Sequence, residues 1–316
     1  MTTAPPMERL PIASIVMRTV GGRSREIRRA IASISANLWR PLEVIVVYQG
    51  AEDAQWDDIQ QLPGEFPKLS VRIMRNAGTG DRRAENLNIG WECAQGRFLG
   101  FLDDDDTLAP NHLPLLIQAM ASTGHAWAYA QVLLRKEDEA LNIVSETPAF
   151  RRHRFSLQSL WKENFLPIHS FLVDRHALNE AIRLRPFHED LDRSEDWDFL
   201  LRLAFWHEPA VVEEFTAVYH VSTGTRNTNL SLMSSVNDEQ HDRLNRAAWA
   251  RCKEVVDQRK AAMASLMWWA REYFDIESNV PGPGAGAMAS SAAPQTTRRL
   301  RQRVLRKLIR ILERLL

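Results

Sequence analysis

Cysteine, long apolar runs and a leader-like start are scarce or missing in this sequence. The 316 residues include two cysteines, Cys93 and Cys252, each within a segment whose pattern is helical. Two isolated thiols predict buried side chains in a reducing compartment and argue against a disulfide framework. No apolar run approaches the roughly 20 residues that a membrane helix needs, and residues 1–10 lack the basic start and apolar core of a signal peptide. We therefore expect a cytoplasmic protein.

An excess of either charge is also missing. The chain has 40 basic and 40 acidic residues, so its composition does not point to nucleic acid as a partner. The balance hides an asymmetry, because residues 298–314 carry eight basic side chains and a single acid, Glu313. Apolar side chains recur there at helical spacing, which predicts a basic amphipathic helix over residues 298–316. Such a helix suits attachment to an anionic membrane, at its inner face, and a partner-docking helix or short coiled coil is the alternative.

What the sequence does contain is an alternation of short apolar strands and amphipathic helices. Strands are expected at residues 12–17, 42–47, 71–74, 98–102, 126–134 and 166–173, with helices starting at Ser24 and covering residues 84–94 and 111–120. A hairpin turn is expected over residues 137–142. Strands and helices that alternate with short connections predict an α/β fold with a mostly parallel sheet flanked by helices.

Four consecutive acids follow the strand expected at residues 98–102. Asp103 to Asp106 repel one another, so their arrangement costs stability unless a cation or hydrogen-bond donors lie among them. Mg²⁺ and Mn²⁺ prefer oxygen ligands and are often shared between carboxylates and substrate phosphates. A solvated acidic loop is the alternative. The apolar strand leading directly into the acids favours a ligand site at the carboxyl end of that strand.

Five motifs in order resemble those of family 2 glycosyltransferases with the nucleotide-binding GT-A fold, over roughly residues 10–225. The motifs are Arg18–Val20, Val46–Gly50, Ala84–Gly90, Gly96–Asp106 and Ser194–Leu203. The resemblance implies a Rossmann-like GT-A domain over residues 10–225. Beyond it we expect a helical extension over 226–280 and a Pro- and Gly-rich flexible linker over 281–297, before the basic helix at 298–316.

The resemblance assigns roles within the acidic stretch. Asp103 would contact the ribose side of the nucleotide and share in binding a Mn²⁺ or Mg²⁺ ion, and Asp105 would be the main metal ligand. Asp104 occupies the variable position, where a structural or exposed side chain is expected, and is a further candidate nucleotide-sugar contact. Asp106 would either support the site or cap the segment that follows. His220 is a further candidate metal ligand.

The nucleotide pocket departs from the family pattern after the second strand, where Tyr48 and Gln49 replace an acid pair. The Gln49 amide can donate and accept, so it could pair with the edge of uracil or thymine while Tyr48 stacks on the base. UDP- or dTDP-sugars are therefore the favoured donors. Thr19, Arg82 and Arg83 are candidate nucleotide-sugar contacts, with a strand-end hydroxyl and surface charges as the alternatives.

A second acidic centre begins with Ser194, which is expected to cap a helix. Glu195 and Asp196 then lie in the first turn, where the amide dipoles stabilise an anion. The resemblance points to Asp196 as the general base and to Glu195 as the reserve candidate, although a plain helix start would look the same. The resemblance also implies that His169 and Trp197 contact the acceptor. A buried core histidine is the alternative for His169.

The interpretation that joins these features is a metal-dependent inverting glycosyltransferase. It would move a sugar from a nucleoside-diphosphate sugar to a hydroxyl group of a glycan or lipid-linked acceptor, in cell-surface polysaccharide synthesis. One alternative is a nucleotidyltransferase on a similar fold, for which Gly21–Arg23 only faintly resembles a phosphate loop. The other is a glycan-binding module without catalysis, which the departures at Tyr48, Gln49 and Glu85 leave open.

Overall fold

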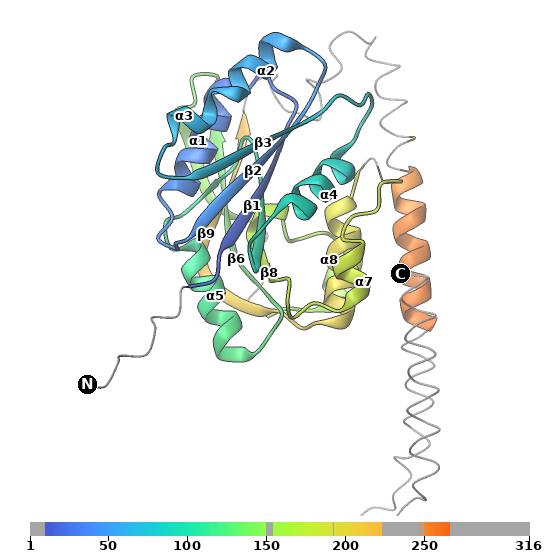
Figure 1. Ribbon diagram of the computed structural model, residues 1–316. Coiled ribbons are helices and arrows are strands. Elements are labelled where there is room, and N and C mark those ends of the chain that lie inside the picture. The colour runs from blue at the N-terminus through green and yellow to red at the C-terminus, as the bar shows by residue number, and fades with distance from the viewer. Residues whose placement is uncertain (1–9, 150–153, 192, 223–246, 248–249, 266–316) are drawn as a thin grey trace, which may run out of the picture. The chain divides into compact units, whose positions relative to one another are not determined.

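Figure 1 shows the computed structural model, which describes residues 10–149, 154–191, 193–222, 247 and 250–265. The chain divides into two compact units, Met1–Cys252 and Lys253–Leu316. In the second unit the described residues, 253–265, are helical. The predicted boundary between residues 225 and 226, the linker at 281–297 and the basic helix at 298–316 lie outside the described residues. Within the described ranges, no helix has the length and apolar character that a membrane crossing requires.

Four parallel strands form the first part of the sheet, as their apolar runs predict. β1 (Ala13–Thr19) lies between β2 (Leu42–Gln49) and β4 (Phe98–Asp103), and β3 (Ser70–Asn76) continues the sheet beyond β2. β2 is buried along almost its whole length, which is typical of a parallel strand covered on both faces. Because the strands are parallel, the ends of β1, β2 and β4 come together at one edge.

The sheet then continues with strands of mixed direction. Among the described residues its order is β3-β2-β1-β4-β8-β6-β9-β5, with β7 paired to β6. The new strands are β5 (Thr107–Leu108), β6 (Trp127–Glu137), β7 (Ile143–Ala149), β8 (Phe171–Asp174) and β9 (Ala210–Ser222). β8 pairs antiparallel with β4 and with β6. β5 follows the acidic stretch and pairs antiparallel with β9, so β9 runs back towards the acids.

Helices cover both faces of the sheet (Figure 1). On one face, α1 (Ser24–Ser35) and α5 (His112–Thr123) pack in the core with side chains of β1 and β2. On the other, α4 (Arg83–Cys93) approaches β1 so closely that a Cβ on Gly90 would lie 2.2 Å from Val16 Cγ1. α8 (Glu195–Trp206) joins α4 there through aromatic contacts around Phe101. The remaining helices are α2 (Asp53–Gln60), α3 (Leu62–Glu65), α6 (Leu157–Lys162) and α7 (Glu180–Leu184).

The structure confirms the predicted α/β class and corrects several local assignments. The strand expected at residues 166–173 is instead a 3₁₀ turn at Ile168–Ser170 followed by β8, because Pro167 cannot donate a ladder hydrogen bond. β9 was not predicted, since Glu213 and Glu214 interrupt its apolar pattern. Ser194 precedes α8, but its φ of +61° is left-handed and its hydroxyl makes no capping hydrogen bond.

Candidate active site

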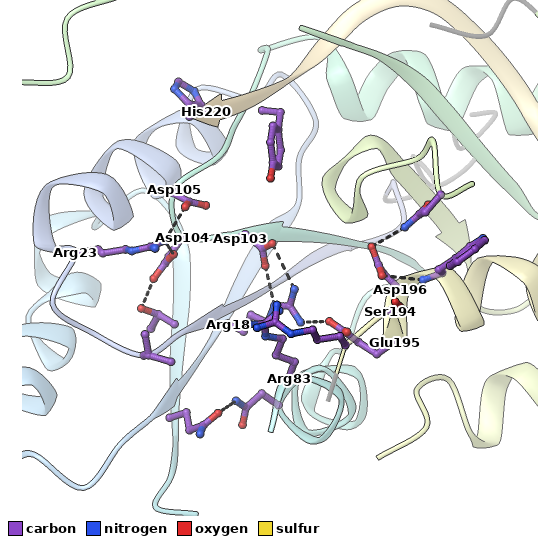
Figure 2. A pocket seen from close by; sticks show the side chains of 18 of the residues that line it. Arg18, Arg23, Arg83, Asp103, Asp104, Asp105, Ser194, Glu195, Asp196 and His220 are labelled. Carbon is purple, nitrogen blue, oxygen red and sulfur yellow. Dashed lines mark hydrogen bonds and ion pairs between the residues drawn. The ribbon is translucent and has the colours of Figure 1, made fainter. Parts of the chain in front are cut away.

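A pocket of about 590 Å³ opens at the edge where β1, β2 and β4 end, beside the first turn of α8. Its lining includes Arg18, Thr19, Gln49, the acids Asp103–Asp105 and the helix start Ser194–Trp197. Figure 2 shows Arg18 of β1, Asp103 of β4 and Glu195 of α8 meeting in this pocket, although they are distant in the sequence. Parallel strand ends and a helix start are where open α/β sheets bind ligands.

The exposed fractions of the four acidic side chains alternate along the turn. The side chains of Asp103 and Asp105 are 30% and 29% exposed, whereas those of Asp104 and Asp106 are 8% and 1% exposed. Asp103 and Asp105 are therefore the acids that a metal ion or substrate can reach from the solvent. The structural role expected for Asp104 agrees with its burial and with its hydrogen bond from Thr19 Oγ1, 2.5 Å long.

Asp106 ties the acidic turn to the rest of the molecule. One of its carboxylate oxygens accepts the backbone N–H of His220 at 2.9 Å, and the other lies 2.9 Å from His169 Nδ1. These contacts join the end of β4 to β9 and to the 3₁₀ turn. Asp106 thus fixes the position of the neighbouring acids and does not itself line the pocket.

Arg18 connects the two acidic centres that the sequence analysis singled out. It lies opposite Asp103 in the register of β1 and β4, and its Nε is 2.8 Å from Asp103 Oδ1. Its Nη1 also forms an ion pair with Glu195. Burial by itself would raise the pKa of Asp103, but the Arg18 guanidinium outweighs that effect and holds the pKa below its ordinary value. Glu195, which is only 2% exposed, is thereby committed to an ion pair.

Arg23 makes the corresponding contacts with the next two acids. Its Nη1 lies 3.1 Å from Asp104 Oδ1 and 2.6 Å from Asp105 Oδ2. One guanidinium does not balance this part of the turn. Burial raises the pKa of Asp105 well above its ordinary value, and the carboxylates of Asp106 and Asp104 add to the rise. The surroundings of Asp105 therefore disfavour its negative charge, and a further cation beside it would relieve this effect.

Asp196 differs from its neighbour Glu195 in having no cation beside it in an ion pair among the described contacts. Its carboxylate accepts the backbone N–H of Trp197 at 2.8 Å and the Asn164 amide at 3.0 Å. Burial, and then the Glu195 carboxylate, raises the pKa of Asp196 to about 7. A group with that pKa, lining a pocket, can take up a proton near neutral pH.

At the end of β2, Gln49 lines the pocket and Tyr48 is buried in the core. Gln49 Nε2 donates to the carbonyl of Gly80 at 2.5 Å, and its Oε1 accepts from Asn86 Nδ2 at 3.0 Å. Tyr48 points to the opposite face, is 1% exposed and packs beside Trp56. Stacking of Tyr48 on a base was therefore a wrong expectation, since successive side chains of a strand point to opposite faces.

The other predicted site residues are divided between pocket and interior. Arg83 lines the pocket, whereas Arg82 does not and instead pairs with Glu85. Trp197 lines the pocket, with its Nε1 donating to the Leu160 carbonyl at 2.7 Å. His169 is 1% exposed and does not line the pocket, which agrees with the core-histidine alternative.

His220 lines the pocket, but both of its ring nitrogens have partners. Nδ1 lies 2.8 Å from Glu137 Oε1, and Nε2 lies 2.8 Å from Thr107 Oγ1. A carboxylate can only accept, so Nδ1 carries the proton and Nε2 accepts from the threonine hydroxyl. Burial, then the Arg29 charge, lowers the pKa of His220, which keeps the ring neutral. In this arrangement neither nitrogen is free to bind a metal ion.

The donor set around the acids suits a hard divalent ion shared with a ligand. Across the described residues, no three His, Cys, Asp or Glu side chains are gathered closely enough to enclose a metal. Mg²⁺ commonly binds through one or two carboxylates together with substrate phosphates. Asp105 and Asp103 are both part-exposed in the pocket. They therefore fit a site in which two carboxylates bind the ion together with substrate phosphates.

Several pocket residues were missed by the sequence analysis. They are Arg18, Arg23, Asn86, Asn164, Arg193 and Tyr219. Burial, together with the acids at 103, 105, 106 and 196, raises the pKa of Tyr219 to about 12, so this phenol stays neutral. Arg18 and Asn86 lie within the motifs Arg18–Val20 and Ala84–Gly90, which were recognised without a role for either residue. Nothing local marked Asn164 or Tyr219.

Comparison with known proteins gives a family match and several relatives. The family model described as "Glycosyl transferase family 2" matches residues 14–182. WcaA of Escherichia coli K12, whose name assigns it to colanic acid biosynthesis, is 26% identical over 69% of this chain and 75% of its own. The succinoglycan biosynthesis protein ExoO of Rhizobium meliloti is 28% identical over 70% of this chain and 64% of its own.

A third relative and two solved structures complete the comparison. The GalNAc(5)-diNAcBac-PP-undecaprenol beta-1,3-glucosyltransferase of Campylobacter jejuni is 30% identical, over 40% of each chain. S. aureus TarS 1-349 in complex with UDP-GlcNAc has a TM-score of 0.51 at 15% identity, covering 76% of this chain and 65% of that one. The mannosyltransferase PcManGT of Pyrobaculum calidifontis, in complex with GDP-Man and Mn²⁺, has a TM-score of 0.50 at 14% identity over 72% and 61%. The structural likeness concerns the fold alone, which is the GT-A fold.

Proposed function

The chain belongs to glycosyl transferase family 2, and from this premise we propose that it moves a sugar from a nucleoside-diphosphate sugar to a hydroxyl group with inversion at the anomeric carbon. One observation carries the proposal. A single pocket brings together part-exposed carboxylates at the end of β4 and a carboxylate with a pKa of about 7 at the start of α8. The two centres are suited to different tasks, leaving-group departure and proton removal.

Asp196 is the proposed general base. Its carboxylate takes the proton of the acceptor hydroxyl as the acceptor oxygen forms a bond to the anomeric carbon. The bond from that carbon to the diphosphate oxygen breaks in the same displacement, and the nucleoside diphosphate departs with the bonding electrons. Glu195 is less suited to this role, because Arg18 already neutralises it. Trp197, the next pocket residue of α8, is the proposed acceptor contact.

Asp105 and Asp103 are the residues proposed to hold Mn²⁺ or Mg²⁺. When bound, the ion would neutralise negative charge that develops on the departing diphosphate. Asp106 holds the turn that presents both acids, through its contacts with His220 and His169. His220 in this proposal is a positioning residue, because its ring nitrogens are engaged by Glu137 and Thr107.

The donor side of the pocket is proposed to lie along Thr19, Gln49 and Arg83. Asn86 holds the Gln49 amide, and Asn76 in turn donates to Asn86 at 2.8 Å. A fixed amide can present one donor and one acceptor, which is the pattern needed to pair with the imide edge of uracil or thymine. This supports a UDP- or dTDP-sugar as donor. Asp103 is proposed to contact the ribose.

The acceptor is proposed to be a glycan or a lipid-linked saccharide of polysaccharide biosynthesis. Support comes from the names of the relatives, which refer to colanic acid, succinoglycan and an undecaprenol-linked glycan. This chain spans less than two thirds of ExoO and of the glucosyltransferase. Their names therefore support a class of acceptor for this chain and no particular acceptor. The basic amphipathic pattern of residues 298–316 agrees with an acceptor located at a membrane.

Two substitutions test the separate roles proposed for Asp105 in metal binding and for Asp196 in proton removal. Asp105→Ala should abolish Mn²⁺-dependent binding of a nucleoside diphosphate, because the diphosphate would then face the remaining acids without a cation. Asp196→Asn should leave that binding intact and lower turnover by about 10²–10⁴, the usual loss on removing a general base. Calorimetry with UDP and Mn²⁺ measures the first effect, and a transfer assay with a lipid-linked acceptor measures the second. Mn²⁺-dependent UDP binding by Asp105→Ala would refute the metal assignment, and normal turnover by Asp196→Asn would refute the base.

A further inference from the structure

Arg23 occupies the space between two of the acids that the proposed metal site needs. A single nitrogen of its guanidinium, Nη1, lies 2.6 Å from Asp105 Oδ2 and 3.1 Å from Asp104 Oδ1. Figure 2 shows the side chain extended towards both carboxylates. Asp105 has no other ion pair with a basic side chain in the described part of the chain. Arg23 is therefore the counter-ion of Asp105 in this structure.

A divalent ion on Asp105 and the guanidinium in its present place compete for the same carboxylate. An ion bound to Asp105 must approach its carboxylate oxygens to about 2.0–2.6 Å, and Nη1 already lies against one of them. The two cations would also repel each other at such close range. Metal binding therefore favours the departure of Arg23 from Asp105.

Two glycines precede Arg23 at the start of α1. Gly21 and Gly22 both have left-handed φ values, +79° and +75°, which few other residues adopt without strain. A Cβ at Gly22 would meet nothing within 4 Å. Arg23 stands at the N-cap position of α1 and makes no side-chain capping hydrogen bond. In the described part of the chain, its side-chain hydrogen bonds are those to the two acids, so these ion pairs orient the guanidinium.

We propose that Arg23 is a displaceable internal cation, which neutralises Asp104 and Asp105 in the free enzyme and transfers to the donor's diphosphate when a divalent ion takes its place. The inference rests on the proposed function, because it concerns the same pocket and the same metal. Guanidinium groups bind phosphate oxygens through paired N–H donors. Arg23 lines the pocket, so the released side chain faces the space that the diphosphate would enter. Metal and donor then favour each other's binding.

Opposite effects on two ligands distinguish this role from a structural one. In Arg23→Gln, Mn²⁺ alone should bind about tenfold more tightly, within the usual range for linked binding events, because its competitor is gone. UDP at saturating Mn²⁺ should bind about tenfold more weakly, because a charge-assisted contact to phosphate is lost. Calorimetry on the full chain measures both affinities. A variant that had merely damaged the pocket would bind both ligands more weakly.

Three further variants make the outcome decisive. Arg25→Gln removes the same charge two residues away, from a side chain that contacts the Ala140 carbonyl, and should leave both affinities unchanged. Arg23→Lys keeps a cation and should bind Mn²⁺ nearly as the wild type does. Asp105→Asn should lose Mn²⁺ binding in either background.

Unchanged or weaker Mn²⁺ binding by Arg23→Gln, with binding still abolished by Asp105→Asn, would overturn the displacement role and leave the metal site standing. Tighter binding by Arg23→Lys as well would also overturn it, since shape and not charge would then be responsible. If neither the wild type nor any variant binds Mn²⁺, the metal assignment of the proposed function fails, and this inference fails with it.

Discussion

Glu195 and Asp196 are adjacent acids in one helical turn, and their surroundings give them different chemistry. Glu195 is buried against the Arg18 guanidinium. Asp196 accepts only neutral N–H donors in its described contacts, from Trp197 and Asn164, and the charge of Glu195 helps to raise its pKa to about 7. When two neighbouring acids have such different environments, one can stay ionised while the other exchanges a proton.

At the residue scale, turnover should follow the ionisation of Asp196. Because its pKa is about 7, the carboxylate is mostly protonated below that pH and cannot accept the acceptor's proton. Turnover at saturating donor should fall by about tenfold per pH unit below pH 6 and level off above pH 8. The measurement is a transfer-rate profile between pH 5 and 9. Residual activity of Asp196→Asn should lack this dependence, and a profile with the same acid limb in that variant would assign the limb to another group.

The same pKa predicts a stability effect with a definite sign. The pKa of Asp196 rises from 3.8 to about 7 on folding, so between these values the folded protein binds more protons than the unfolded chain. The contribution of Asp196 to the free energy of unfolding therefore falls as the pH rises through this window. Asp196→Asn should unfold at a higher temperature than the wild type at pH 8, and the difference should vanish near pH 4.

Thermal unfolding followed by circular dichroism at the two pH values measures the difference. Glu195→Gln is the matched control. It should lower the unfolding temperature at pH 8, because it removes a carboxylate that Arg18 stabilises. A lower unfolding temperature for Asp196→Asn at pH 8 would show that the ionised carboxylate is not strained in the folded protein.

At the scale of the element, α8 is held in place by a buried ion pair between Asp198 and Arg202, which follow the proposed base Asp196 in the same helix. Arg202 Nε lies 2.8 Å from Asp198 Oδ2, and the two side chains are 2% and 0% exposed. Arg202 also donates to the carbonyls of Arg185 and Pro186. These contacts join α8 to the segment after α7, and they set the position from which Glu195 and Asp196 reach the pocket.

Arg202→Met should therefore be strongly destabilising. It removes the guanidinium from a buried carboxylate, a change that typically costs about 3–5 kcal/mol. The control is Arg135→Met, which breaks the more exposed Arg135–Glu146 pair between β6 and β7 and should cost at most about 1 kcal/mol. Urea unfolding of both variants gives the two free energies. Equal losses would mean that burial does not decide the value of this pair.

At the scale of the whole molecule, the basic tail is predicted to attach the enzyme to membranes. Residues 298–314 carry eight basic side chains, and each adds roughly 1 kcal/mol of attraction near an anionic lipid surface. Co-sedimentation with anionic liposomes should fall sharply when Thr297–Leu316 are deleted, and high salt should weaken the attachment of the full chain. Hydrolysis of the donor should survive the deletion, because the proposed catalytic residues lie far upstream. Equal sedimentation of both forms would reject the attachment.

Periodicity and composition were enough to predict much of the α/β framework. Apolar runs identified β1, β2, β3, β4 and β6, because a strand covered on both faces must be apolar along its length. They missed β9, which carries Glu213 and Glu214, and they misread residues 166–170, where Pro167 starts a 3₁₀ turn. The predictions failed where polar side chains or a proline interrupt a pattern that pairing with distant strands completes.

The sequence by itself also identified both acidic centres, since four adjacent carboxylates and an acidic helix start can be recognised without coordinates. Only the tertiary structure decided how each acid is paired and how deeply it is buried. The register of β1 against β4 places Arg18 beside Asp103, and the packing of α8 brings Glu195 to the same guanidinium. Pairing, burial and pKa depend on neighbours that are remote along the chain. Spacing along the sequence cannot show those neighbours, and so it could not separate a neutralised acid from a candidate base.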